Sequence, residues 1–138
     1  GIDSKRIILE VQEDRQGYFA AYNRIDIALD PFPFTGGTTS VEGLWMGVPL
    51  LTLAGDSLVS RQGVGVLMNA GLQEWIADDE EEYLAKAIRF ASDLDKLASL
   101  RADLRAQVLA SPLFDAPRFA RNFENALLEM WHQAGNLH

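Results

Sequence analysis

The chain has 138 residues, among which 20 acidic residues outnumber 12 lysines and arginines to give a formal net charge of -8, and it contains no cysteine. The missing cysteines exclude a disulfide framework and a thiolate metal site, and the acidic balance argues against a nucleic-acid partner. No apolar run approaches the roughly 18 residues that a membrane span needs, and no basic region followed by an apolar one begins the sequence. We therefore expect a cytoplasmic protein without a membrane partner, with a single domain over residues 1–138.

The start of the chain predicts a strand, a loop and a short helix. Residues 6–11 (RIILEV) are largely apolar and β-branched, which favours a buried strand. Residues 13–18 are expected to form a loop at the carboxyl end of that strand. Residues 18–23 then predict a short helix, whose aromatic side chains we interpret as core packing.

A loop rich in proline and glycine separates the next two predicted strands, residues 24–29 and 49–53. The loop itself, residues 32–37, has too much proline and glycine for a helix or strand. It is followed by the pattern T-x-x-E, formed by Thr39 and Glu42. This pattern predicts a capping box, in which the Thr39 hydroxyl accepts a hydrogen bond from the Glu42 N–H while the Glu42 carboxylate accepts one from the Thr39 N–H.

The start of that predicted helix is a candidate anion site. Free N–H groups and the positive end of the helix dipole collect at Gly37, Thr38 and Thr39, an arrangement that most often binds phosphate. The same residues also fit an ordinary capped helix after an ordinary loop, and the pattern alone leaves both interpretations open.

Beyond the second of these strands, the sequence predicts a helix over residues 57–70 and a last short strand over residues 73–77. Five consecutive acidic residues follow, at positions 78–82. They resemble a metal-binding patch, but their place directly before the helical run 83–92 favours carboxylates that cap that helix and complement its dipole.

Two amphipathic helices complete the chain. The first has apolar residues at a helical period, Leu94, Leu97, Leu100, Leu104 and Val108, and ends at Ser111-Pro112. The second carries a similar stripe, Phe119, Phe123, Leu127, Met130 and Trp131, which we interpret as core. The order of elements predicts an α/β fold, a Rossmann-like, doubly wound parallel sheet of about four strands with flanking helices.

Two segments, TGGTT at 35–39 and EGLWMGVP at 42–49, closely resemble the nucleotide-sugar-binding half of the O-linked N-acetylglucosamine transferase family. The likeness extends upstream over residues 17–30 and downstream to residues 111–114. Bacterial members of that family combine TPR repeats with a SPINDLY-like catalytic region. The resemblance implies that the chain is the later part of the C-terminal domain of a GT-B fold, and a fragment of a longer TPR-containing protein.

The family resemblance also implies a function. Members of the family are inverting glycosyltransferases that move N-acetylglucosamine or a related sugar from UDP to a protein Ser or Thr. The implied partners are a UDP-sugar and, for the full-length parent, a protein acceptor, with no cofactor or metal. The implied UDP-sugar-binding residues are Gly36, Gly37, Thr38, Thr39, Glu42, Arg15 and Tyr18. No catalytic residue is assigned, because any base would come from the part of the family's catalytic region that this chain lacks.

Two other functions compete with transfer. The chain would serve as a non-catalytic nucleotide-binding or scaffold module if it kept the fold but lost turnover, and another GT-B enzyme, such as a sugar-nucleotide epimerase, would use a similar fold. The fragment alone is expected to be inactive, and its truncated sheet is expected to form a homo-oligomer through an exposed strand edge.

Overall fold

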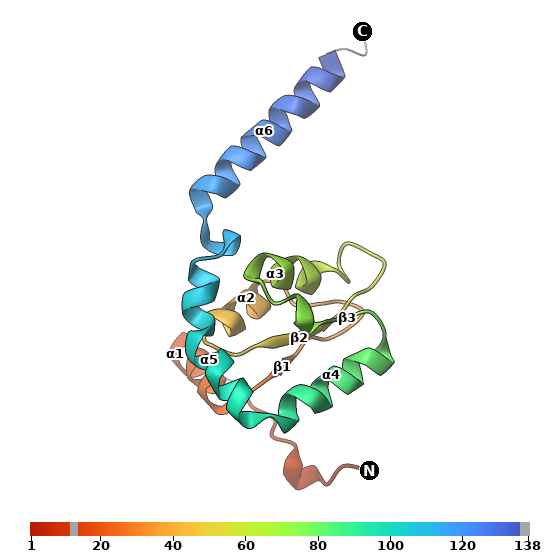
Figure 1. Cartoon of the computed structure of the whole chain (residues 1–138), viewed down its shortest axis with the longest axis vertical. Helices are drawn as coiled ribbons and strands as arrows, with labels where there is room; N and C mark the ends of the chain where they lie inside the picture. The colour runs from red at the N-terminus through yellow and green to blue at the C-terminus, as the bar shows by residue number, and fades with distance from the viewer. Residues whose placement is uncertain (12–13, 136–138) are drawn as a thin grey trace.

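The computed structural model describes residues 1–11 and 14–135 and shows an α/β fold built on a small parallel sheet (Figure 1). The strands, in the spatial order β1-β2-β3, are β1 (Ala28–Leu29), β2 (Leu50–Leu53) and β3 (Ile76–Ala77). Ala28 pairs with Leu50, and Thr52 pairs with Ile76. The predicted α/β class and parallel sheet are confirmed, with three strands instead of about four in the described residues.

The strand predicted at residues 6–11 is wrong. The 3-10 turn η1 (Ser4–Arg6) overlaps the start of this segment, and residues 7–11 contain no strand. The side chains of Leu9 and Val11 are each 92% exposed. A β-branched run has strand propensity, but a strand also needs a neighbouring strand and a buried face, and this chain offers the segment neither.

The helix predicted at 18–23 begins earlier than expected. Helix α1 (Arg15–Ala21) starts there because the Asp14 carboxylate accepts a hydrogen bond from the Gly17 N–H at 2.6 Å. A 3-10 turn, η2 (Tyr22–Arg24), leads on toward β1. The expected loop at 13–18 is therefore mostly helix, and residue 13 lies outside the described residues.

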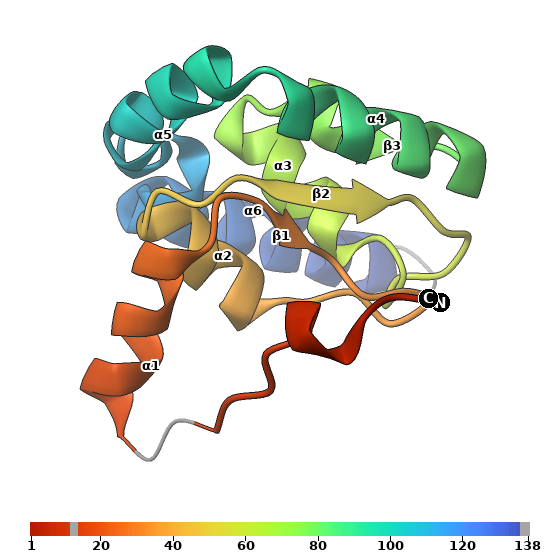
Figure 2. The same cartoon turned by 90° about the horizontal axis from the view of Figure 1, so that it is seen from below.

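Helices cover both faces of the sheet. Figure 2 shows α4 (Glu80–Ser92) on one face and α2 (Thr38–Trp45) on the other, and α3 (Gln62–Ala70) packs against α2 and β2. The core lies between these layers and includes Leu44, Leu51, Leu67 and Leu104. The strand predicted at 49–53 is confirmed.

Three boundaries differ from the sequence prediction. Of the segment expected as a strand at 24–29, only Ala28–Leu29 is strand, and Arg24 ends the turn η2. The helix expected at 57–70 starts only at Gln62, because the preceding residues form a turn in which the Ser60 hydroxyl accepts from the Ser57 N–H at 2.9 Å. In the segment expected as a strand at 73–77, the first three residues form the 3-10 turn η3 (Gln73–Trp75), and only β3 is strand. Side-chain bonding within a turn competes with regular structure in a way that apolar periodicity does not reveal.

The acidic run caps α4, as predicted. The Asp79 carboxylate accepts from the Glu82 N–H at 2.7 Å, and the Glu82 carboxylate accepts from the Asp78 N–H at 2.7 Å. Glu80 and Glu81 join Glu82 in the first turn, where their negative charges complement the helix dipole.

Helix α5 (Leu94–Leu109) closes the amino-terminal end of the sheet. Its predicted apolar stripe is largely confirmed, because Leu97, Leu104 and Val108 are buried. On the same face Arg101 donates to the Gly47 carbonyl at 3.2 Å and pairs with Asp26, and these two partners lie just before β2 and β1. The 3-10 turn η4 (Pro112–Phe114) ends the helix at the predicted position.

Helix α6 (Ala116–Gly135) extends away from the rest of the fold (Figure 1). None of its residues is buried, so the interpretation of its apolar stripe as core is wrong. A helical period shows that one face is apolar, but it does not identify what covers that face. None of the helices in the described ranges combines the length and the hydropathy that crossing a bilayer requires.

Candidate functional site

Two loops and two helix starts meet at the carboxyl ends of β1 and β2. The first loop leads from β1 to α2, and the second leads from β2 to α3. Thr35 joins them: its hydroxyl donates to the Val59 carbonyl at 3.0 Å and accepts from the Gly63 N–H at 3.3 Å. Hydrogen bonds of Thr35 therefore hold the two loops together at the carboxyl ends of β1 and β2.

Asp30 anchors the first loop to the sheet. Its carboxylate is almost fully buried and accepts two hydrogen bonds, from the Gly36 N–H and from the Thr52 hydroxyl, each at 2.7 Å. Burial raises the pKa of the Asp30 carboxyl, while the bonds from Gly36 and Thr52 oppose that shift. Sequence reasoning treated Asp30 only as the end of a strand, although an acidic residue directly before a Gly-rich loop is a usable signal for such an anchor.

Two glycines allow the loop and the helices to approach each other. A Cβ atom on Gly36 would lie 2.4 Å from the Ser40 hydroxyl oxygen, and one on Gly63 would lie 2.3 Å from an Asp30 carboxylate oxygen. Neither site has room for a methyl group. The loop backbone is thereby held directly against the first turn of α2.

The first turn of α2 has no side-chain cap. Gly37 occupies the N-cap position, and Thr38 and Thr39 are already inside the helix. The predicted capping box is therefore wrong. The positive end of the helix dipole and its first N–H groups remain available at the predicted anion site, next to the two threonine hydroxyls.

The N-cap residue of α3 makes no side-chain cap, although the Thr35 hydroxyl of the neighbouring loop accepts from the Gly63 N–H in the first turn. Arg61 occupies the N-cap position, and its guanidinium donates to the Gly55 carbonyl at 3.0 Å. The start of α3 lies close to the loop, since a Cβ on Gly37 would be 3.0 Å from the Gln62 side-chain oxygen. The N-terminus of α2, which has no side-chain cap, lies beside the Gly-Gly loop and next to the start of α3, an arrangement that suits an anionic ligand.

Glu42 makes a tertiary contact where sequence analysis expected a local one. Its carboxylate accepts from the Tyr18 hydroxyl at 2.9 Å, across the interface between α1 and α2. The Tyr18 and Tyr22 hydroxyls are 2.8 Å apart, and the Tyr22 hydroxyl lies 3.4 Å from the Thr39 carbonyl, to which it donates. Burial and the bonds with Tyr22 and Glu42 raise the pKa of the Tyr18 hydroxyl, so it remains a donor to the carboxylate.

The structure brings together most, but not all, of the predicted site residues. Gly36, Gly37, Thr38 and Thr39 form the loop and first helical turn, and Tyr18 and Glu42 lie beside them on facing helices. Arg15 starts α1, and its guanidinium lies 5.4 Å from the ring centroid of Phe19. Within the described residues, no hydrogen bond or ion pair joins Arg15 to the loop or to Glu42. Sequence reasoning missed Tyr22, since its aromatic character at helical spacing indicated only packing.

Comparison with known proteins assigns this arrangement to a family. Residues 1–123 match the family model described as glycosyl transferase family 41. The chain belongs to glycosyltransferase family 41. The resemblance inferred from the TGGTT and EGLWMGVP segments is thus confirmed, and the family is one of enzymes.

Individual relatives agree with this assignment. The chain is 39% identical over 134 residues to a probable UDP-N-acetylglucosamine-peptide N-acetylglucosaminyltransferase SPINDLY from Hordeum vulgare, a match that covers 96% of this chain and 14% of the barley protein. It is 31% identical over 131 residues to UDP-N-acetylglucosamine-peptide N-acetylglucosaminyltransferase from Caenorhabditis elegans, covering 95% of this chain and 11% of the worm protein.

A solved structure gives the same result. A mutant O-GlcNAc transferase from Thermobaculum terrenum superposes on this fold with a TM-score of 0.88 and 39% sequence identity. The match covers 96% of this chain and 26% of the bacterial one. The family 41 chain described here therefore corresponds to a minor part of the length of its longer relatives.

Proposed function

We propose that this chain is the donor-binding part of an inverting glycosyltransferase that transfers N-acetylglucosamine, or a related sugar, from UDP to Ser or Thr of a protein. One observation carries the proposal. In this member of family 41, the N-terminus of α2 has no side-chain cap and directly follows Gly36-Gly37. A cytoplasmic location and a protein acceptor bound by the longer parent belong to the same proposal.

In this proposal the diphosphate lies at the start of α2. The N–H groups of Gly37, Thr38 and Thr39 and the two threonine hydroxyls surround it, and Gly36 gives the backbone its close approach. As the bond between sugar and diphosphate breaks, negative charge grows on the departing diphosphate. Fixed N–H groups and the helix dipole stabilise that charge and need no metal for it.

Glu42 is assigned to the ribose of the donor. One of its carboxylate oxygens accepts from Tyr18, and a ribose hydroxyl would donate to the other. The Tyr18 bond orients the carboxylate in advance, which reduces the side-chain entropy lost on binding. Tyr18 and Arg15, which lies three residues before it on α1, are assigned to contact the nucleotide base.

Calorimetry with UDP tests the proposal on the chain as it is. We expect weak, saturable binding of UDP and much weaker binding of uridine, because the helix N-terminus recognises the diphosphate. Transfer to peptide should be undetectable, since this chain spans only a minor part of its relatives. An absence of saturable heat with UDP would refute the donor-site proposal and favour the scaffold module, while measurable transfer would refute the expectation of an inactive fragment.

A further inference from the structure

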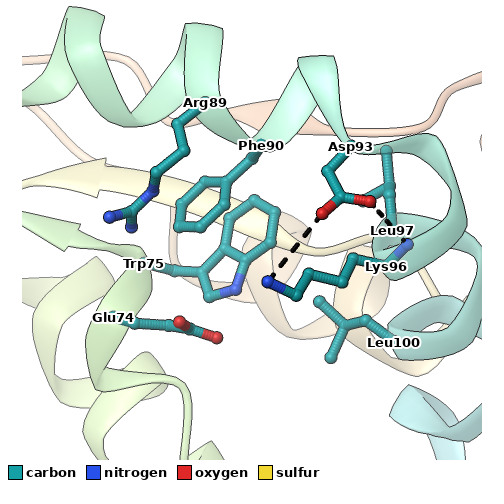
Figure 3. A pocket seen from close by; sticks show the side chains of 8 residues that line it. All are labelled: Glu74, Trp75, Arg89, Phe90, Asp93, Lys96, Leu97 and Leu100. Carbon is teal, nitrogen blue, oxygen red and sulfur yellow. Dashed lines mark hydrogen bonds and ion pairs between the residues drawn. The ribbon is translucent and has the colours of Figure 1, made fainter.

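A pocket of about 450 Å³ lies far from the proposed donor site (Figure 3). Its walls come from η3, the end of α4 and the beginning of α5. Trp75 in its wall directly precedes β3, whereas residues 36–39 follow the carboxyl end of β1. Figure 2 shows α4 and α2 on opposite faces of the sheet, so the pocket beside α4 and the start of α2 are separate sites.

The pocket wall contains a buried donor without an acceptor. Trp75 is only 2% exposed, and its ring stacks on Phe90 with centroids 3.9 Å apart and planes 18° apart. Across residues 1–11 and 14–135, its indole Nε1 is the one buried side-chain nitrogen or oxygen that has no hydrogen-bond partner. A buried N–H without an acceptor is unfavourable, so an incoming acceptor would gain a full hydrogen bond there.

A cation faces the same space. The Lys96 side chain is 87% exposed, and its ammonium lies 3.8 Å from the Asp93 carboxylate, beyond ordinary hydrogen-bond length. Asp93 is already engaged as the cap of α5, accepting from the Lys96 N–H at 3.1 Å. In Figure 3 the Lys96 chain reaches across the pocket toward the nitrogen-bearing edge of Trp75. A long exposed side chain of this kind can shift to admit a ligand.

We propose that this pocket binds a small carboxylate with an apolar body. One carboxylate oxygen accepts from the Trp75 indole, the other pairs with Lys96, and the apolar body packs against Leu97 and Leu100. A single negative charge is favoured over a phosphate dianion, because the pocket wall already balances two acidic side chains, Glu74 and Asp93, against two basic ones, Arg89 and Lys96.

The probe is N-acetyl-leucine, with N-acetyl-leucinamide as its neutral match. The indole N–H signals of the full chain are followed by proton-nitrogen NMR, and the variants Trp45→Phe and Trp131→Phe assign the other two tryptophans, so that the core tryptophan stays intact. We expect saturable movement of the Trp75 signal with the acid, and about tenfold weaker binding of the amide.

Two variants separate the charge contacts. Lys96→Met should weaken the acid about tenfold, and Glu74→Gln should tighten it, because a repelling carboxylate is removed. Lys5→Met, a lysine in η1 outside the pocket wall, is the matched control and should change nothing. Equal binding of acid and amide, movement of all three indole signals together, or unchanged binding in Lys96→Met would each overturn the proposal.

A third ligand identifies the biological source of the carboxylate. N-acetyl-glycyl-glycyl-leucine carries the same terminal group on a peptide chain. Tighter binding of this peptide than of N-acetyl-leucine assigns the pocket to the carboxyl terminus of a protein, whereas tighter binding of N-acetyl-leucine assigns it to a free small acid. Either result supports the carboxylate pocket, and the absence of saturable binding by both refutes it.

Discussion

At the scale of single residues, the contact between Tyr18 and Glu42 decides how the candidate donor site is built. Glutamate three positions after threonine is a local capping pattern, yet the carboxylate bonds a tyrosine 24 positions away along the chain. The tertiary bond also leaves the first turn of α2 free for a ligand. Removal of either partner should therefore weaken ligand binding and not only folding.

Tyr18→Phe tests this contact. The variant loses the hydroxyl that orients Glu42, so we expect UDP affinity to fall about three- to tenfold and the free energy of unfolding to fall by about 1 kcal/mol. Calorimetry and urea denaturation measure the two effects. Tyr83→Phe is the matched control, because the Tyr83 hydroxyl donates to the Asp30 carbonyl at 3.3 Å and does not touch Glu42. Equal UDP affinities in the two variants would contradict the role of Tyr18.

Glu42→Gln tests the carboxylate itself. Glutamine retains an acceptor for Tyr18, so folding should be largely preserved. Loss of the charge-assisted bonds to ribose should weaken UDP by about 1–3 kcal/mol. Calorimetry at matched stability checks this expectation, and an unchanged UDP affinity would assign Glu42 a structural role alone.

Gly36→Ala should damage the loop through steric overlap. The new methyl carbon would lie 2.4 Å from the Ser40 hydroxyl oxygen, so the loop or helix must shift. We expect a loss of about 1–3 kcal/mol in the free energy of unfolding. Gly65→Ala is the control, since a Cβ there meets nothing within 4 Å and lies inside α3. That change should stabilise the chain by about 0.5–1 kcal/mol. Urea denaturation measures both changes, and equal free energies of unfolding in the two variants would contradict the steric argument.

Because the Asp30 carboxyl is buried, we expect the stability of the fold to depend on pH. Burial raises the pKa of this carboxyl above the ordinary value of 3.8, so the folded state holds this proton more tightly than the unfolded chain does. The contribution of Asp30 to stability is thus complete below pH 3.8 and is lost as the pH rises through the raised pKa. The free energy of unfolding of the parent should fall relative to that of Asp30→Asn over this range. Urea denaturation at several pH values measures the difference, and parallel pH profiles of the parent and of Asp30→Asn would contradict it.

At the scale of elements, α6 is held by little of the remaining chain. None of its residues is buried, and Phe119 and Trp131 are 68% and 75% exposed. A chain that lacks residues 116–135 should therefore unfold at nearly the same urea concentration as the full chain. It should also self-associate less, because a large apolar stripe is removed. Sedimentation velocity and denaturation check both expectations, and a large loss of stability would show that α6 contributes to the fold.

The elements that sequence analysis located correctly are those whose signals are local. An apolar run bounded by turn residues predicted β2, and leucines spaced three or four residues apart predicted α5. The acidic run that contains Asp79 predicted the cap of α4. The errors share a different cause. Residues 6–11 and the apolar stripe of α6 require partners that this chain does not supply, and the capping prediction for Glu42 overlooked a competing tyrosine on another helix. Local pattern predicts what a segment can form, whereas tertiary competition decides what it does form.

The candidate site divides in the same way. Gly36, Gly37, Thr38 and Thr39 could be predicted to lie together, because a Gly-rich loop before a helix has a recognisable pattern. Tyr22 and Asp30 were missed, since their roles depend on hydrogen bonds to residues distant in sequence. Buried polar contacts of this kind leave no periodic signal.

At the scale of the whole molecule, the sheet has an open edge. The strand order places β1 at the border, bonded only to β2, and Leu29 on it is 60% exposed. Unpaired backbone groups at such a border tend to pair with a second chain, so we expect the protein to form homo-oligomers. Leu29→Lys should reduce this association. Leu84→Lys replaces an exposed leucine of α4, away from the edge, and serves as control. Light scattering that shows a monomer in the parent would exclude association through this edge.

Helix α1 adds a consequence for the exchange of backbone protons with solvent. It contains no buried residue, and its contacts with α2 include the Tyr18 hydrogen bond to Glu42 and the edge-on packing of Phe19 against Trp45, with ring centroids 5.9 Å apart. Tyr22, just beyond α1, donates to the Thr39 carbonyl. Opening of α1 would release the Glu42 carboxylate, so the populations of docked α1 and of bound nucleotide are thermodynamically linked. Saturating UDP should therefore slow deuterium uptake throughout residues 15–21, although the diphosphate itself sits on a different helix.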